Sequence, residues 1–151
     1  IAIDIDSLKR VKSAEIEGLH RYQLEAGDVL FQSHGSKNGA IALEDTLFGI
    51  AATGLYVIRI KDERILPMYL VWYINHKNCQ TTIEKLRQGT GIPRISREEI
   101  SLLKIYIPSV ERQSEIVRLA GMQQRENELR KQISELTSQF IDAATWQMAK
   151  D

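Results

Sequence analysis

The first hundred residues combine short apolar runs with turn-forming residues, a pattern typical of short strands. Three of these runs are rich in β-branched and aromatic side chains and lie beside glycines, so we expect them to be strands. They are Asp28–Gln32, Gly39–Leu43 and Leu55–Ile60. The connection 33–38 is polar and contains serine, glycine and asparagine, which favour turns. The first two strands are therefore predicted to form a hairpin with a polar tip.

Helical patterns follow the third predicted strand. Pro67 suits the first turn of a helix, because proline has no N–H to leave unpaired there. The segment Met68–Asn78 continues this helix with large apolar side chains. A second short helix is predicted over Gln80–Gln88, and Gly89 would end it. This part of the chain therefore predicts two consecutive helices.

The segment before residue 109 predicts a capped helical turn and a last strand. Ser96 and Glu99 have the spacing of a capping box, in which each side chain accepts a hydrogen bond from the backbone amide of the other residue. The run Leu103–Ile107 is predicted as a strand that Pro108 stops. Together with the preceding elements, these patterns predict a mixed α+β domain over residues 1–108.

The remaining residues, 109–151, predict one long helix. They contain no proline and a single glycine, and Ser109 can cap the first turn. Glu111 would lie near the positive end of the helix dipole. Roughly forty residues at about 1.5 Å each give a rod about 55–60 Å long. Apolar or small side chains recur in heptads along it, and those expected to pair with another helix are Met122, Leu129, Ile133, Leu136, Phe140 and Ala143.

An apolar stripe of this length needs a partner. It either folds back across its own domain or pairs as a coiled coil with a helix from another chain or another repeat. A helix this long would extend well past a domain of about a hundred residues, whose radius of gyration is about 13 Å. We therefore favour pairing over folding back.

Composition and charge bound the class of protein. The chain has 151 residues, is 43% hydrophobic and 26% charged, and has no run long enough to span a bilayer, as expected for one globular domain. Asp4 and Asp6 stand where a signal peptide would carry lysines, so a cytoplasmic protein is expected. The net charge is zero, yet residues 77–97 hold five basic residues and one acidic residue. Such a local basic stretch can still attract phosphate.

Residues typical of catalysis or metal binding are sparse. The sequence has no phosphate-binding loop, no dinucleotide fingerprint and no nucleophile elbow. One cysteine and three scattered histidines do not have the spacing of a metal site, and no cofactor is expected. A small hydrolase built on Cys79 and His76 is the remaining enzyme interpretation, against the more common buried structural cysteine. A non-catalytic protein is the better prediction.

Three segments in order carry a family resemblance. A Gly-Asp-Val-Leu-Phe element occupies residues 27–31, and Gly-Thr-Gly-Ile-Pro-Arg-Ile-Ser occupies residues 89–96. A strand-like run then passes through Pro108 into a Pro-x-x-Glu-Arg-Gln helix start at residues 108–113. In this order and at these spacings, over about residues 20–148, the chain resembles the specificity subunit of type I restriction–modification systems.

The resemblance implies a non-catalytic DNA reader. In that family a specificity subunit carries two target-recognition domains, each followed by a long helix. The two helices pack antiparallel, and each domain reads one half of a bipartite site on double-stranded DNA. A methyltransferase subunit binds S-adenosylmethionine and flips the adenine, and a restriction subunit hydrolyses ATP and cleaves. This sequence has no internal repeat and would be half of such a subunit, either part of a longer chain or a half that pairs with a second copy.

The candidate DNA contacts lie in two loops. The hairpin tip is polar enough to enter a major groove, where asparagine can bond adenine bidentately. The second loop combines glycines with arginines, which bind phosphate or guanine. The candidates are Ser36, Lys37, Asn38, Arg87, Gln88, Thr90 and Arg94. The alternative function is a coiled-coil interaction module that does not bind DNA.

Overall fold

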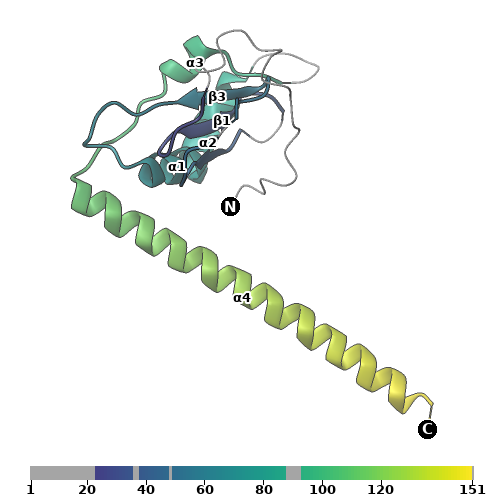
Figure 1. The fold of residues 1–151 in the computed structure, drawn as a ribbon. Coiled ribbons are helices and arrows are strands. Elements are labelled where there is room, and N and C mark those ends of the chain that lie inside the picture. The colour runs from purple at the N-terminus through teal and green to yellow at the C-terminus, as the bar shows by residue number, and fades with distance from the viewer. Residues whose placement is uncertain (1–22, 36–37, 48, 88–92, 151) are drawn as a thin grey trace. The chain divides into compact units, whose positions relative to one another are not determined.

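The computed structural model describes residues 23–35, 38–47, 49–87 and 93–150. It divides into two compact units, Ile1–Gln113 and Ser114–Asp151. We call the first unit the head. Its elements are β1 (Val29–Gln32), β2 (Ala40–Ala42), β3 (Leu55–Ile58), α1 (Pro67–Asn75), α2 (Lys77–Leu86) and α3 (Arg97–Ser101), and they are followed by α4 (Val110–Met148). Figure 1 shows this order along the ribbon.

The three strands form an antiparallel sheet in the order β2-β1-β3. β1 is the central strand, and its register pairs Leu30 with Ile41 on one side and with Val57 on the other. The predicted hairpin between β1 and β2 is confirmed. All three strands lie within their predicted ranges. β3 ends at Ile58 rather than at residue 60.

Both faces of the central strand are covered. Val29 and Phe31 are completely buried and pack in a cluster with residues of α1 and α2, such as Ile74 and Ile83. Leu30 points to the other face, where it packs with a smaller cluster that includes Leu24. Successive side chains of a strand alternate between faces. The uninterrupted apolar run in β1 therefore reflects a strand that is buried on both sides.

The boundary between α1 and α2 lies at His76. This residue ends α1 and caps α2, and its ring Nδ1 accepts a hydrogen bond from the backbone N–H of Asn78 at 3.3 Å. The two predicted helices are confirmed. α1 is three residues shorter than predicted and α2 begins three residues earlier, because the backbone of His76 is extended and its side chain caps α2. The predicted end of the second helix at Gln88 and Gly89 falls outside the described residues.

The capping box is confirmed, but the strand predicted after it is wrong. Ser96 Oγ accepts a hydrogen bond from the Glu99 amide at 3.2 Å, and the Glu99 carboxylate accepts one from the Ser96 amide at 2.8 Å. Residues 103–107 form no strand. Two of their carbonyls instead accept hydrogen bonds from tyrosine hydroxyls of α1. The Tyr69 hydroxyl donates to the carbonyl of residue 106 at 2.6 Å, and the Tyr73 hydroxyl donates to the carbonyl of residue 104 at 3.2 Å. Side chains of α1 thus take the place of a neighbouring strand.

The long helix is confirmed as α4, and a buried glutamine fixes its first turn. Ser109 Oγ accepts a hydrogen bond from the Arg112 amide at 3.4 Å, as predicted for a cap. Hydrogen bonds from its own backbone amide and from the Ser109 side chain lower the pKa of the Glu111 carboxyl. The Gln113 side chain is completely buried within the head. Its Oε1 accepts from the Leu66 amide at 2.9 Å, and its Nε2 donates to the carbonyls of residues 64 and 108.

Beyond its first turn, α4 exposes most of its side chains. The predicted pairing residues are exposed, with Leu129 at 42%, Ile133 at 63% and Phe140 at 75%. Ion pairs between neighbouring turns support the helix, including Arg130 with Glu126 at 2.8 Å. No helix in the described ranges has the length and apolar character needed to cross a bilayer.

Candidate nucleic-acid interface

The two predicted DNA loops lie side by side in the head, although they are about fifty residues apart in the sequence. His34 and Arg94 form an isolated antiparallel bridge. The Gly35 amide donates to the Pro93 carbonyl at 2.9 Å, and the Ile95 amide donates to the Ser33 carbonyl at 2.9 Å. We call this pairing the loop junction. It joins the hairpin connection to the segment that precedes α3.

Polar side chains form hydrogen bonds that hold the loop junction in place. Ser33 is completely buried, and its hydroxyl donates to the Gly54 carbonyl at 2.8 Å and contacts the ring Nδ1 of His34 at 3.0 Å. The hydroxyl of Tyr56, on β3, donates to the Ile95 carbonyl at 2.9 Å. These contacts hold the backbone of both loops against the edge of the sheet. The junction is therefore built into the fold.

Asn38 lies at the end of the hairpin connection but does not face solvent. Its side chain is completely buried, its Nδ2 donates to the Gln32 carbonyl at 2.9 Å, and its Oδ1 accepts from Arg87 Nε at 2.7 Å. Its backbone carbonyl accepts from Gln80 Nε2 at 2.8 Å. The side-chain oxygen and amide group that would bond adenine are thus already engaged. Asn38 closes the hairpin and ties it to α2, and we do not carry it forward as a base-reading residue.

The other sequence-predicted site residues divide into two groups. Arg94 is exposed at the loop junction, and Arg87 is half-buried at the end of α2, in contact with Asn38. The structure therefore joins Arg87 to Asn38 of the hairpin connection and places Arg94 beside His34 of the same connection. Four candidates fall outside the described residues: Ser36, Lys37, Gln88 and Thr90.

Sequence reasoning missed a cleft beside the loop junction. It has a volume of about 900 Å³, and His34, Tyr56 and Arg97 contribute to its walls. Arg97 is exposed, and its guanidinium carbon lies 5.5 Å from the centre of the Tyr56 ring. A cation stacked on an aromatic ring is held in place while its N–H donors stay accessible. Arg97 was counted in the basic stretch, but only its position beside Tyr56 adds it to the site.

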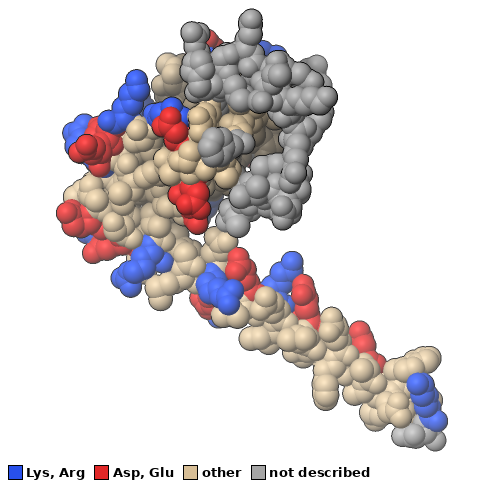
Figure 2. All heavy atoms as spheres, viewed as in Figure 1, with Lys and Arg blue, Asp and Glu red and all other residues tan. Residues whose placement is uncertain are grey.

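The surface around these residues carries both signs of charge. On the visible part of the head, Lys and Arg side chains are interspersed with Asp and Glu, apart from the area covered by grey atoms (Figure 2). One arginine of the head has a structural role, because Arg59 donates to both carboxylate oxygens of the buried Asp28 at 2.8 Å. The Arg59 guanidinium lowers the pKa of Asp28. Arg59 therefore stabilises the fold. The arginines of the candidate interface are Arg87, Arg94 and Arg97.

The residues of the alternative hydrolase interpretation serve packing and capping. Cys79 is buried in the core, and this burial raises the pKa of its thiol. The ring Nδ1 of His76 accepts the Asn78 amide. A buried thiol with a raised pKa is a poor nucleophile. Within the described ranges, no three His, Cys, Asp or Glu side chains gather as metal ligands would.

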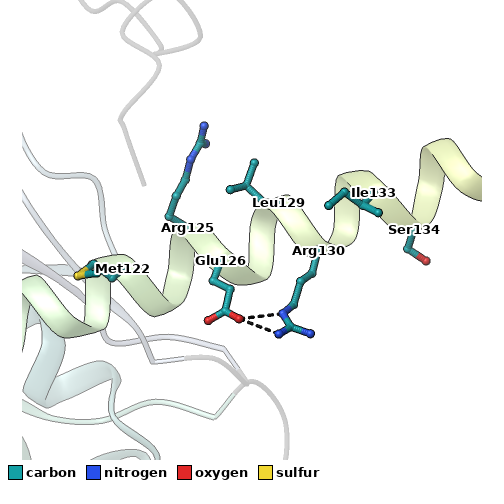
Figure 3. A pocket seen from close by; sticks show the side chains of 7 residues that line it. All are labelled: Met122, Arg125, Glu126, Leu129, Arg130, Ile133 and Ser134. Atoms are coloured by element: carbon teal, nitrogen blue, oxygen red, sulfur yellow. Dashed lines mark hydrogen bonds and ion pairs between the residues drawn. The ribbon is translucent and has the colours of Figure 1, made fainter.

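The exposed stripe on α4 is the second candidate interface. Met122, Leu129 and Ile133 follow one another along the helix in Figure 3, where Arg125 points to the same side of the helix as Leu129 and the ion-paired Glu126 and Arg130 point to the other. An apolar stripe flanked by charged side chains is the usual composition of a coiled-coil face. The stripe continues through Leu136 and Phe140, which are 64% and 75% exposed.

Comparison with known proteins identifies the family. The family described as the type I restriction modification DNA specificity domain matches residues 5–137. A relative in Methanocaldococcus jannaschii, a putative type I restriction enzyme MjaX specificity subunit, is 28% identical over 124 residues, which cover 78% of this chain and 29% of the relative. The chain thus spans less than a third of the length of that relative. With most of its residues matched, the chain belongs to the family of type I restriction modification DNA specificity domains.

Proposed function

We propose that this chain is a sequence-specific DNA-binding module that reads one half of a bipartite site through the loop junction and Arg97. The juxtaposition of Arg94, at the junction, with Arg97, beside the cleft, carries the proposal. Backbone hydrogen bonds hold the two loops together, and the arginine side chains supply N–H donors for phosphate oxygens or for the edge of guanine. Phosphate contacts would provide affinity, and contacts to base edges would provide sequence preference.

Membership of the family supports a proposal for the wider assembly. The chain would scaffold an adenine methyltransferase subunit, and through it a restriction subunit, while remaining non-catalytic itself. The α4 helix would pair antiparallel with a second copy or with the second half of a longer chain. Two heads joined in this way would read two half-sites at a fixed separation. We expect such an assembly to work in the cytoplasm, where the chromosome is accessible.

Arginine substitutions test the proposal. Arg94→Ala and Arg97→Ala are compared with Lys104→Ala, which also removes one positive charge from an exposed position but lies outside the loop junction. Binding to a labelled duplex is measured by fluorescence anisotropy across a salt series. Each phosphate contact contributes about 0.9 to the slope of log affinity against log salt, so each arginine variant should lower the slope by about one if it contacts phosphate.

The outcomes separate the roles of the two arginines. A uniform loss of affinity on all sequences, with a lower salt slope, identifies a phosphate contact. A relaxed preference at one base pair identifies a base contact, with a cost of about 1–3 kcal/mol. If both arginine variants bind DNA as Lys104→Ala does, the loop junction is not the interface and the proposal is wrong.

The exposed stripe favours a second candidate function. A chain of zero net charge with a long apolar helix face fits a coiled-coil interaction module that does not bind DNA. The two functions differ at low salt, where a phosphate-binding surface gains affinity steeply. Absence of binding to any duplex at low ionic strength would favour the interaction module.

A further inference from the structure

The arginines of the candidate interface are all hydrogen-bond donors. A guanidinium has five N–H groups and no acceptor, so it can bind phosphate oxygens and guanine but not an amino group. We propose that His34 supplies an acceptor beside them, and that its ring Nε2 binds the exocyclic amino group of adenine or cytosine in the major groove. This inference rests on the proposed function, to which it adds one specificity-determining residue.

His34 lies in the loop junction itself. Its backbone pairs with Arg94, and the Gln32 side chain donates to its carbonyl at 3.1 Å. Its ring is partly exposed and contributes to the wall of the cleft that Arg97 also lines. The imidazole thus belongs to the same surface as the two arginines that carry the proposed function.

A chain of hydrogen bonds fixes which ring nitrogen carries the proton. The Ser33 hydroxyl has one proton, which it donates to the Gly54 carbonyl at 2.8 Å. The contact of 3.0 Å between Ser33 Oγ and the ring Nδ1 of His34 therefore needs a proton from the ring. In the neutral imidazole Nδ1 is then the donor, and Nε2 carries the lone pair of an acceptor.

The reverse arrangement is unfavourable. If the Ser33 hydroxyl donated to Nδ1 instead, its oxygen and the Gly54 carbonyl oxygen would lie 2.8 Å apart with no proton between them. Ser33 is completely buried, so water does not relieve this repulsion. The tautomer with a proton on Nδ1 is therefore the one that satisfies this group of polar atoms.

Gly54 also fixes the position of the ring. Its φ is +95°, a conformation that favours glycine, and a β-carbon there would lie 3.0 Å from Nδ1 of His34. The ring therefore packs where a side chain at this position would otherwise lie. Packing and the Ser33 contact engage the Nδ1 end of the ring, and within the described part of the chain no hydrogen bond engages Nε2.

A fixed acceptor divides the four bases into two pairs. In the major groove adenine and cytosine present amino groups, which donate hydrogen bonds, whereas guanine O6 and thymine O4 accept them. The lone pair of Nε2 attracts the amino groups and repels the two oxygens. Arginine side chains favour guanine instead. His34 and the arginines would therefore select different bases.

A matched pair of substitutions tests the inference. His34→Asn keeps an amide that can donate to Ser33 Oγ, but the asparagine side chain is too short to reach the position of Nε2. His76→Asn makes the same change elsewhere in the head, where asparagine keeps an acceptor that can cap α2. The unsubstituted chain and both variants select from a randomised duplex pool at pH 8, where imidazole side chains are neutral.

We expect His34→Asn to lose the preference at one base pair of the motif and to keep the others, and His76→Asn to match the unsubstituted chain. At that base pair, purine then replaces adenine, or pyrimidin-2-one replaces cytosine, which deletes only the amino group. The deletion should weaken binding by the unsubstituted chain about three- to tenfold. It should weaken binding by His34→Asn less than about twofold, because that variant already lacks the acceptor.

A second measurement needs no variant. Long-range proton–nitrogen NMR correlations of the unsubstituted chain at pH 8 show which ring nitrogen of His34 is protonated. We expect the proton on Nδ1, and a proton on Nε2 would overturn the inference.

The remaining outcomes separate this inference from the proposed function. A motif that His34→Asn leaves unchanged, or an amino deletion that affects the unsubstituted chain and this variant equally, would overturn the role of His34 alone. The unsubstituted chain would then still read DNA through other residues. If the unsubstituted chain enriches no motif, the proposed function is wrong, and the role of His34 is wrong with it.

Discussion

Substitution of Gln113 by glutamate tests how the family's helix start is held in place. The buried amide makes three hydrogen bonds, one accepted from the Leu66 amide and two donated to the carbonyls of Arg64 and Pro108. A glutamate carboxylate keeps the first bond. Its second oxygen would take the place of Nε2, which now lies 2.7 and 2.8 Å from the two carbonyl oxygens. Two favourable contacts become repulsive in a site with no exposure to water.

The magnitude follows from these contacts. Two lost hydrogen bonds cost about 1–3 kcal/mol, and desolvation of the charge brings the total to about 3–5 kcal/mol at pH 7. The repulsion raises the pKa of the introduced carboxyl in the folded state above its unfolded value of about 4.3. The destabilisation is therefore full above the folded pKa and shrinks as the pH falls toward the unfolded pKa.

Urea unfolding measures this effect. Fluorescence of Trp72 in the head is followed in a Trp146→Phe background, at fixed protein concentration, at pH 7 and pH 5. Gln123→Glu makes the same chemical change at an exposed position of α4 and should stay within about 0.5 kcal/mol of the parent. If Gln113→Glu matches this control at pH 7, or its effect does not depend on pH, the buried amide does not hold the helix start as described.

Three further predictions concern other contacts. Asp28→Asn should destabilise the head at pH 7 and less in acid, because Arg59 lowers the pKa of Asp28 and the ion pair is lost as the pH falls through that pKa. Urea midpoints of the variant and the parent between pH 7 and pH 3 measure this effect, and a difference that stays constant with pH would contradict it. Ser96→Ala should cost about 1 kcal/mol through loss of the helix cap, and a urea midpoint equal to that of the parent would contradict it. The double variant Ile133→Asp, Leu136→Asp should be monomeric by analytical ultracentrifugation, and an unchanged dimer would argue against pairing through the stripe.

Local patterns predicted much of the fold. The hairpin follows from the composition of two short runs and the turn residues between them, and the capping box follows from two residues three positions apart. Such features depend on neighbours in the sequence, so the sequence alone contains them. The same holds for α4, whose length follows from the absence of proline over about forty residues.

Features that depend on distant partners were missed. The alternation of apolar residues in Leu103–Ile107 is typical of a strand, yet tyrosine hydroxyls of α1 bind its carbonyls. Asn38 was predicted to be an accessible residue of the hairpin tip, and the burial of Gln113 had no signal in its neighbours, because polar residues in a turn or a helix usually lie on the surface. Both are buried because other segments supply their hydrogen-bond partners. The loop junction likewise depends on backbone pairing between segments about sixty residues apart.

The candidate site was predicted only in part for the same reason. The basic stretch pointed to the second loop, and its charge is visible in the sequence. The role of Arg97 depends on the ring of Tyr56, which comes from a strand some forty residues earlier. A search for arginines near turn residues in both loops would have found Arg94 but not this stacked pair.

Selection from a randomised duplex tests the central claim, that the head reads DNA sequence, most directly. The full chain is incubated with the duplex pool at low salt, bound molecules are recovered and sequenced, and the experiment is repeated with Arg94→Ala. We expect enrichment of a short motif by the unsubstituted chain, and a weaker or altered motif with the variant. Bound DNA with no enriched motif, or no bound DNA at any ionic strength, would contradict the claim.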